Sequence, residues 1–295
     1  MLIFTILTQA VAAVTALSTG SASGTNKRAE DVPVNWGVLA FPGIDLVDVF
    51  GPLEVLYFVA GNRHLNVKII TPTEDSIIVT PPMKNPHNST FSPEIVGRAT
   101  FDDELDLDVL LVPGGAAARD PSLTYVDDYV KKMFPKVKYF LTVCTGAIFA
   151  ARAGVLEGKR ATTNKNAWDL VTAEGNNITW VAPARYVIDG NVWSSSGVAA
   201  GIDLTFAFVK EFYGEELHDR ISILTEVIPR AHDDDPFTDM LGIPHQGQLA
   251  ELPSGGANAQ NGQLEALGSD DIAQVEMFAT AGMDLGDRIR KGDID

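Results

Sequence analysis

A predicted strand meets a predicted helix without an intervening loop in the stretch Leu141-Thr142-Val143-Cys144-Thr145-Gly146-Ala147-Ile148-Phe149. The apolar run before Cys144 is typical of a buried strand, and helical spacing follows it up to Gly154, a common kind of helix end. A side chain at such a corner is forced outward on a tight bend, as in the nucleophile elbow of hydrolases. The stretch therefore predicts a strand–helix unit with a candidate reactive group at its corner.

The same alternation of apolar runs and amphipathic segments continues on both sides of this stretch. Repeated strand–helix alternation predicts one layered α/β domain, with a mostly parallel sheet covered on both faces. In such sheets ligands bind beyond the carboxyl ends of the strands, and segments 42–48, 113–116 and 144–146 all follow predicted strand ends. The expected strands are 36–41, 66–70, 107–112 and 137–143, with short strands in 76–94 and a hairpin in 185–194; the expected helices are 45–60, 121–134, 145–153 and 202–213.

Cys144 is the one cysteine of the chain, which excludes an internal disulfide framework and a multi-cysteine zinc site. At the start of a helix, free backbone N–H groups and the positive end of the helix dipole point at the sulfur. Both lower the pKa of a thiol from about 8.5, so we expect a reactive thiolate at neutral pH. The competing interpretation is a buried structural cysteine.

Two other strand ends offer groups that fit a reaction at this thiol. Asp48 lies between Val47 and Val49 at the start of a predicted helix, where apolar neighbours would raise the pKa of its carboxyl group and let it shuttle a proton. Asp45 is the competing acid, expected to be an exposed helix cap. Gly114 and Gly115 are expected to supply backbone N–H groups that stabilise an anionic intermediate, together with the N–H of Thr145.

Several segments resemble the ThiJ/PfpI superfamily, and most of all its isonitrile (isocyanide) hydratase branch. The resemblance covers roughly residues 34–230, in the family's order. The segments that carry it are 37–43 (GVLAFPG), 48–56 (DVFGPLEVL), 111–115 (LVPGG), 143–147 (VCTGA), 153–163 (AGVLEGKRATT) and 195–203 (SSGVAAGID). The resemblance implies a flavodoxin-like three-layer sandwich, a homodimer, a cysteine nucleophile, and neither a cofactor nor a metal.

The same resemblance implies roles for individual residues. Cys144 would attack the terminal carbon of an isonitrile, Asp48 would serve as acid and base, and Thr145 would orient the thiolate or the carboxylate. Water would then release an N-substituted formamide. Asn164 and Gly197 would contribute to substrate binding.

The sequence also departs from the family. Thr145 stands where family peptidases and some glyoxalase relatives have a histidine directly after the cysteine, which argues against peptidase activity. Asn164 stands where the hydratase branch often has a histidine.

Two alternatives to a hydratase remain open. One is a glyoxalase- or deglycase-type enzyme that acts on small reactive carbonyls through the same thiol. The other is a non-catalytic or redox-sensing module, in which peroxide would oxidise Cys144 without turnover. Amidotransferase activity requires a late His-x-Glu partner, which the sequence lacks.

Charge limits the partners of the chain. Lys and Arg number 22 against 39 Asp and Glu, a net charge of −17. Such an acidic surface repels phosphate backbones and anionic membrane faces, so we expect neither nucleic acid nor a membrane as partner. A small-molecule substrate fits the composition better.

The two ends of the chain differ from its body. Residues 1–28 combine an uncharged apolar run, a small-residue stretch and the dibasic pair Lys27-Arg28, which predicts a signal peptide with a pro-segment and therefore secretion; without cleavage, a cytoplasmic location is expected. No later stretch is apolar enough to anchor the chain in a membrane. Sequons at Asn88 and Asn177 fit glycosylation of a secreted protein. The domain itself is expected at 29–240, and 241–295 is expected to be a flexible acidic tail with one helix.

Overall fold

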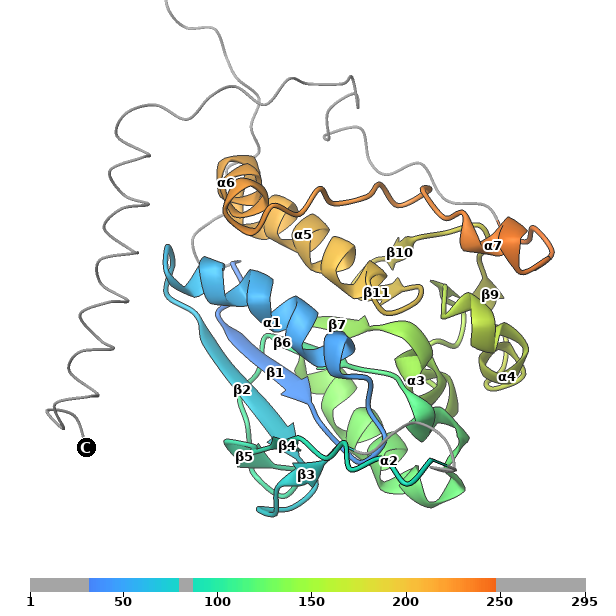
Figure 1. The fold of residues 1–295 in the computed structure, drawn as a ribbon, viewed down its shortest axis with the longest axis horizontal. Coiled ribbons are helices and arrows are strands. Elements are labelled where there is room, and N and C mark those ends of the chain that lie inside the picture. The colour runs from blue at the N-terminus through green and yellow to red at the C-terminus, as the bar shows by residue number, and fades with distance from the viewer. Residues whose placement is uncertain (1–31, 80–86, 248–295) are drawn as a thin grey trace, which may run out of the picture. The chain divides into compact units, whose positions relative to one another are not determined.

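A computed structural model describes residues 32–79 and 87–247 of the chain (Figure 1). Its centre is a seven-stranded sheet in the order β10-β11-β7-β6-β1-β2-β5. All neighbouring strands in it are parallel except the hairpin pair β10 and β11. The strands of this sheet are β1 (Asn35–Leu39), β2 (Asn66–Thr71), β5 (Ala99–Thr100), β6 (Val109–Val112), β7 (Tyr139–Thr142), β10 (Tyr186–Asp189) and β11 (Val192–Ser195). The predicted flavodoxin-like α/β fold with a mostly parallel sheet is thus confirmed.

Helices cover both faces of the sheet. On one face α1 packs against α5, and α5 against α6; on the other face α2 packs against α3, with α4 beside it (Figure 1). The central strand β6 is buried along its whole length, as expected for a strand with a helical layer on each side. The helices are α1 (Leu46–Ala60), α2 (Thr124–Met133), α3 (Ala147–Arg152), α4 (Trp168–Thr172), α5 (Ala200–Tyr213), α6 (Glu215–Thr225) and α7 (Phe237–Met240).

Short elements complete the fold. Two small sheets pair β3 (Ile77–Ile78) with β4 (Glu94–Ile95) and β8 (Arg160–Ala161) with β9 (Thr179–Trp180). Short 3-10 turns cover 116–119, 121–123, 134–136, 144–146 and 165–167. The predicted hairpin turn at Asp189-Gly190 is confirmed, since Gly190 has a φ of +62° between β10 and β11.

Parallel pairing of β1, β6 and β7 brings their carboxyl ends to one edge of the sheet. The loops that follow them are joined there by hydrogen bonds: Asp45 N–H donates to Gly114 O at 2.9 Å, and Gly115 N–H donates to Thr145 Oγ1 at 2.7 Å. The prediction that segments 42–48, 113–116 and 144–146 meet at one edge is therefore confirmed. This edge is the place where a site is expected in such folds.

The ends of the chain fall largely outside this description. The predicted signal peptide and pro-segment (1–28) and residues 248–295 of the predicted tail lie outside the described residues. Residues up to 247 belong to the body, because Gln246 exchanges two backbone hydrogen bonds with Ala182, at 2.8 and 2.9 Å. Within the described part of the chain, no helix combines the length and apolar character that a bilayer crossing requires.

Candidate active site

Cys144 occupies a strained backbone position at the end of β7. Its φ is +59°, which is rare for a residue other than glycine. Two hydrogen bonds fix its peptide groups: Cys144 N–H donates to Ser196 O at 3.0 Å, and Thr163 Oγ1 donates to Cys144 O at 2.9 Å. A Cβ on the following Gly146 would lie 2.4 Å from Val112 O, so only glycine allows the bend to close. Strain held in place by its surroundings is characteristic of functional sites.

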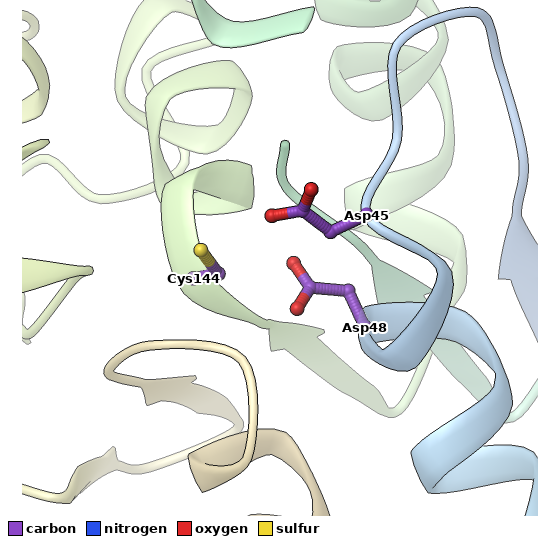
Figure 2. Close-up of side chains that lie close together, drawn as sticks. All are labelled: Asp45, Asp48 and Cys144. Carbon is purple, nitrogen blue, oxygen red and sulfur yellow. The ribbon is translucent and has the colours of Figure 1, made fainter. Parts of the chain in front are cut away.

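Asp48 brings a fully buried carboxyl group to the thiol. Its Oδ2 accepts a hydrogen bond from Gly114 N–H at 2.8 Å, whereas no N–H or O–H group among the described residues donates to the buried Oδ1. Figure 2 shows this carboxyl group directed toward Cys144. Burial raises the pKa of Asp48 to about 7, and the nearby Asp45 charge adds to the rise, while the Gly114 N–H and the thiol offset part of it. The expected rise in the pKa of this acid is confirmed.

Asp45 belongs to the same cluster, contrary to the expectation of an exposed cap. It stands at the N-cap position of α1 but its side chain makes no capping hydrogen bond. Its carboxyl group points at the thiol and at Asp48 instead (Figure 2), and one ligand atom from each of the three residues lies within 4.8 Å of the others. Partial burial raises the pKa of Asp45 as well. Among the described residues, these three side chains are close enough together to offer one ligand atom each to a metal ion.

The thiol itself differs from the expectation. Cys144 is only 2% exposed, and burial together with the Asp48 and Asp45 charges raises its pKa, whereas a lowered pKa was predicted. The N–H of Thr145 and the amide of Asn164 oppose the rise but do not cancel it. The helix that was expected to lower the pKa is short, because a 3-10 turn occupies 144–146 and α3 begins only at Ala147. The resting group is therefore a thiol that faces a proton acceptor.

Asn164 donates a side-chain hydrogen bond to the sulfur. Its Nδ2 donates to Cys144 Sγ at 3.2 Å, and its Oδ1 accepts from Ala167 N–H at 3.1 Å, which fixes the orientation of the amide. Gly197 lies next to this amide, since a Cβ on it would come within 3.1 Å of Asn164 Nδ2. The structure thus brings two predicted binding residues to the thiol.

Gly114, Gly115 and Thr145 have other partners than predicted. Gly114 N–H donates to Asp48, and Gly115 N–H donates to Thr145 Oγ1 at 2.7 Å, so neither is a free donor for an anionic intermediate. Thr145 Oγ1 donates in turn to Gly115 O at 3.0 Å, while the N–H of Thr145 acts on the Cys144 sulfur, so the predicted orienting role of Thr145 stays a prediction. A Cβ on Gly114 would lie 2.5 Å from Thr145 N, so this close approach needs glycine. The three residues instead hold the loop after β6 against the elbow.

Thr163 and Ser196 anchor the elbow through their hydrogen bonds to Cys144, a role that their residue types alone do not predict. Both lie in segments that carried the family resemblance, 153–163 and 195–203, and that was the only signal for them. The sequon residues Asn88 and Asn177 are both exposed and outside the site, and their glycosylation stays a prediction.

We expect Asn164→Leu to make the thiol less reactive. The substitution removes the donor that stabilises developing negative charge on sulfur, and a hydrogen bond to a charged group contributes about 1.5–3 kcal/mol, so alkylation of Cys144 by iodoacetamide should slow by roughly tenfold or more. Gly197→Ala is the control: its added Cβ contacts the same amide but leaves the hydrogen bond donor in place, so the alkylation rate should fall less. An unchanged rate in Asn164→Leu would contradict the role of this amide.

The residues of this site lie in a part of the chain that matches a known protein family. The model of the DJ-1/PfpI family matches residues 37–211, which include Asp48, Cys144 and Asn164. The chain belongs to the DJ-1/PfpI family. A relative, the isonitrile hydratase of Pseudomonas putida, is 30% identical over 196 residues, which is 65% of this chain and 78% of that protein.

Other members of the DJ-1/PfpI family are also similar. A deglycase of Pyrococcus abyssi is 32% identical over 127 residues, 43% of this chain and 71% of that protein. The crystal structure of a ThiJ/PfpI family protein from Pseudomonas syringae shares the fold, with a TM-score of 0.53 and 24% identity over 67% of this chain and 77% of that one. Isonitrile hydratase and deglycase are thus the activities named among the relatives.

Proposed function

We propose that the protein is a cysteine-dependent hydratase that converts isonitriles into N-substituted formamides. The observation that carries the proposal is the pairing of a strained, buried thiol with a buried carboxyl group whose Oδ1 has no N–H or O–H donor among the described residues. The similarity to isonitrile hydratase over 78% of that protein supports the choice of substrate class. Dimerisation stays a prediction.

The first half of the reaction forms a covalent adduct. Asp48 takes the thiol proton as Sγ of Cys144 bonds to the terminal carbon of R–N≡C, and one carbon–nitrogen electron pair moves to nitrogen. The carbon keeps its own electron pair and receives the proton from Asp48, which gives the thioimidate R–N=CH–S. Asp48 can do this because a pKa of about 7 makes it both an acceptor and a donor at neutral pH. Asn164 stabilises the negative charge on sulfur during the attack.

The second half releases the product. Asp48 removes a proton from water as its oxygen attacks the thioimidate carbon, the remaining π pair of C=N moves to nitrogen, and nitrogen is protonated. In the tetrahedral adduct R–NH–CH(OH)–S, an oxygen electron pair then forms C=O as the carbon–sulfur bond breaks with its electron pair on sulfur, and the hydroxyl proton passes through Asp48 to the sulfur, which restores the thiol. The product is R–NH–CHO, and the net reaction consumes one water.

The test is turnover of aromatic and aliphatic isonitriles, with formamide measured by NMR. We expect turnover by the wild-type protein, none by Cys144→Ala, and no change on addition of a chelator. Formamide formed by Cys144→Ala, or by neither protein, would contradict the proposal.

A glyoxalase- or deglycase-type reaction on small reactive carbonyls is the second candidate, favoured by the similarity to the deglycase of Pyrococcus abyssi. The same assay with methylglyoxal, followed by lactate, distinguishes the two. The redox-sensing alternative has less support, because oxidation by peroxide needs an accessible thiolate and the pKa of this buried thiol is raised.

A further inference from the structure

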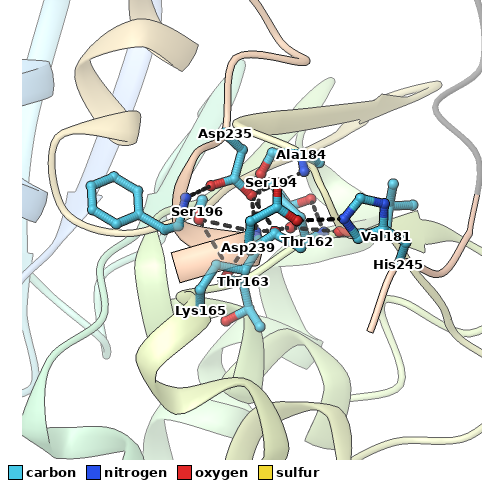
Figure 3. A network of polar contacts seen from close by, with 12 residues as sticks. Thr162, Thr163, Lys165, Val181, Ala184, Ser194, Ser196, Asp235, Asp239 and His245 are labelled. Atoms are coloured by element: carbon cyan, nitrogen blue, oxygen red, sulfur yellow. Dashed lines mark hydrogen bonds and ion pairs between the residues drawn. The ribbon is translucent and has the colours of Figure 1, made fainter. Parts of the chain in front are cut away.

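Lys165 is a buried cation that the proposed reaction does not use. Its side chain is 1% exposed, and its Nζ lies over the ring of Trp168, 5.1 Å from the centroid. Figure 3 shows the ammonium group surrounded by oxygen atoms. Its partners are Thr162 Oγ1 (3.0 Å), Ala184 O (3.0 Å), Ser196 Oγ (3.1 Å), Asp235 Oδ2 (3.2 Å) and Thr163 O (3.3 Å). An ammonium group is buried in this way only with a compensating charge and a full set of acceptors.

Two of these partners are the residues that fix the peptide groups of Cys144. Ser196 accepts from Cys144 N–H through its carbonyl, while its Oγ lies against Lys165. Thr163 donates from Oγ1 to Cys144 O, while its own carbonyl accepts from Lys165. Ser196 Oγ also donates to Thr163 O at 3.3 Å, so Lys165 joins the two anchors of the elbow.

Asp235 completes the network from a distant part of the chain. Its side chain is fully buried and comes from the segment 227–247 that follows α6. Oδ2 accepts from Ala184 N–H at 3.1 Å and from Thr238 Oγ1 at 2.7 Å, and Oδ1 accepts from Phe237 N–H at 3.0 Å. Asp235 is therefore fixed in place independently of Lys165.

We propose that Lys165 and Asp235 are positioning residues that keep the Cys144 thiol opposite Asp48. The pair does not touch the thiol; it acts through Thr163 and Ser196. Without the ammonium group, Thr163 O and Ser196 Oγ lose a shared partner, so the two residues that hold Cys144 at its positive φ are less firmly fixed to each other. Small displacements of a reacting atom are costly in rate, so the thiol should lose its alignment with the Asp48 acceptor.

The proposal rests on the proposed function in taking Cys144 as the reacting group and Asp48 as the acceptor of its proton. The pH profile of alkylation by iodoacetamide tests it without any isonitrile, and because the chain has one cysteine, the alkylation rate reports this thiol alone. In the wild type the rate should rise through a midpoint near 7, as Asp48 ionises and becomes a proton acceptor. In Lys165→Met we expect the midpoint to move up by about one unit or more, toward the thiol's own titration at higher pH.

A double variant separates positioning from stability. Removal of one member of a buried pair leaves an uncompensated charge, whereas removal of both is often tolerated. Lys165→Met/Asp235→Asn should therefore recover thermal stability relative to Lys165→Met but keep the displaced midpoint. Where isonitrile turnover is measurable, kcat should fall at least tenfold with KM within about twofold. A double variant that regains the wild-type midpoint together with its stability would overturn the proposal.

Arg185→Met is the matched control. Arg185 and Asp203 form another buried ion pair, at 2.7 Å, and Asp203 also binds the backbone of the segment 227–247 through Arg230 N–H. The Arg185 guanidinium binds neither Thr163 nor Ser196, so the variant should lose stability while the midpoint stays near 7. A shifted midpoint in this control would mean that general loosening is sufficient, and would overturn the specific role of Lys165. Where Lys165→Met does not fold, Thr163→Val removes one anchor of Cys144 directly, and an unshifted midpoint in it also counts against the proposal.

Discussion

Asp48→Asn should lower kcat/KM for the preferred substrate by at least a hundredfold. Asparagine keeps the shape of the side chain and an oxygen for Gly114 N–H, but it cannot accept the thiol proton. General acid–base groups contribute roughly 10²–10⁴-fold, and here the same carboxyl group acts in both halves of the reaction.

The pH dependence of thiol alkylation shows whether Asp48 is the proton acceptor. Below a pH of about 7 the wild-type carboxyl group is protonated and cannot accept the thiol proton, so thiol alkylation should fall about tenfold per pH unit below this value. Asp48→Asn should lose this limb and respond only to the thiol's own titration at high pH. A wild-type midpoint near 7 that persists in Asp48→Asn would show that another group accepts the proton.

Asp45→Asn is the control for a nearby carboxyl group. Its charge contributes to the raised pKa of Asp48, so its removal should move the alkylation midpoint below that of the wild type. The loss of activity should be several-fold rather than a hundredfold, because Asp48 remains. An equal loss in both variants would contradict the assignment of the acceptor to Asp48.

The sequence was sufficient to predict which loops meet. Apolar runs that end in Pro113-Gly114 and in Cys144 predict strand ends, and parallel pairing then forces those ends to one edge. The raised pKa of Asp48 could also be predicted, because its apolar neighbours in sequence are its neighbours in the helix. These are local features, and local features are visible in the chain itself.

The protonation state of Cys144 could not be predicted in the same way. The pKa of a thiol depends on what covers it, and the covering groups come from elements far apart in sequence: Asp45 before α1 and Asn164 after β8. The sequence pattern predicts a helix dipole that would lower the pKa of the thiol. It does not predict how far burial raises the same pKa, and in the structure the effect of burial is the larger of the two. Asp45 illustrates the same limit, since a residue at an N-cap position normally caps and this one turns to the thiol instead.

Asp48→Asn should also stabilise the protein at alkaline pH, in contrast to its effect on activity. The pKa of this carboxyl group is about 7 in the folded protein against 3.8 for an unperturbed aspartate. Below pH 3.8 the carboxyl group is neutral in both the folded and the unfolded protein, so its ionisation does not change the free energy of unfolding. Between pH 3.8 and pH 7 the unfolded chain releases the proton while the folded chain retains it. The free energy of unfolding therefore falls as the pH rises. Above 7 the full difference, about 4 kcal/mol, has been lost.

Denaturant unfolding at pH 8 and at pH 4.5 measures this effect. At pH 8 we expect Asp48→Asn to be more stable than the wild type by roughly 2–4 kcal/mol, and at pH 4.5 the difference should shrink to less than about 1 kcal/mol. Asp108→Asn is the control of opposite sign: partial burial acts to raise the pKa of Asp108, but Lys138 and the N–H groups of Asn35 and Val34 together lower it. Its stabilising charge is present above pH 4, so its removal should destabilise the protein at pH 8. If Asp48→Asn is less stable than the wild type at pH 8, the Asp48 carboxylate stabilises the fold. The expected gain in stability would instead mean that the site keeps a destabilising acid because the reaction needs it.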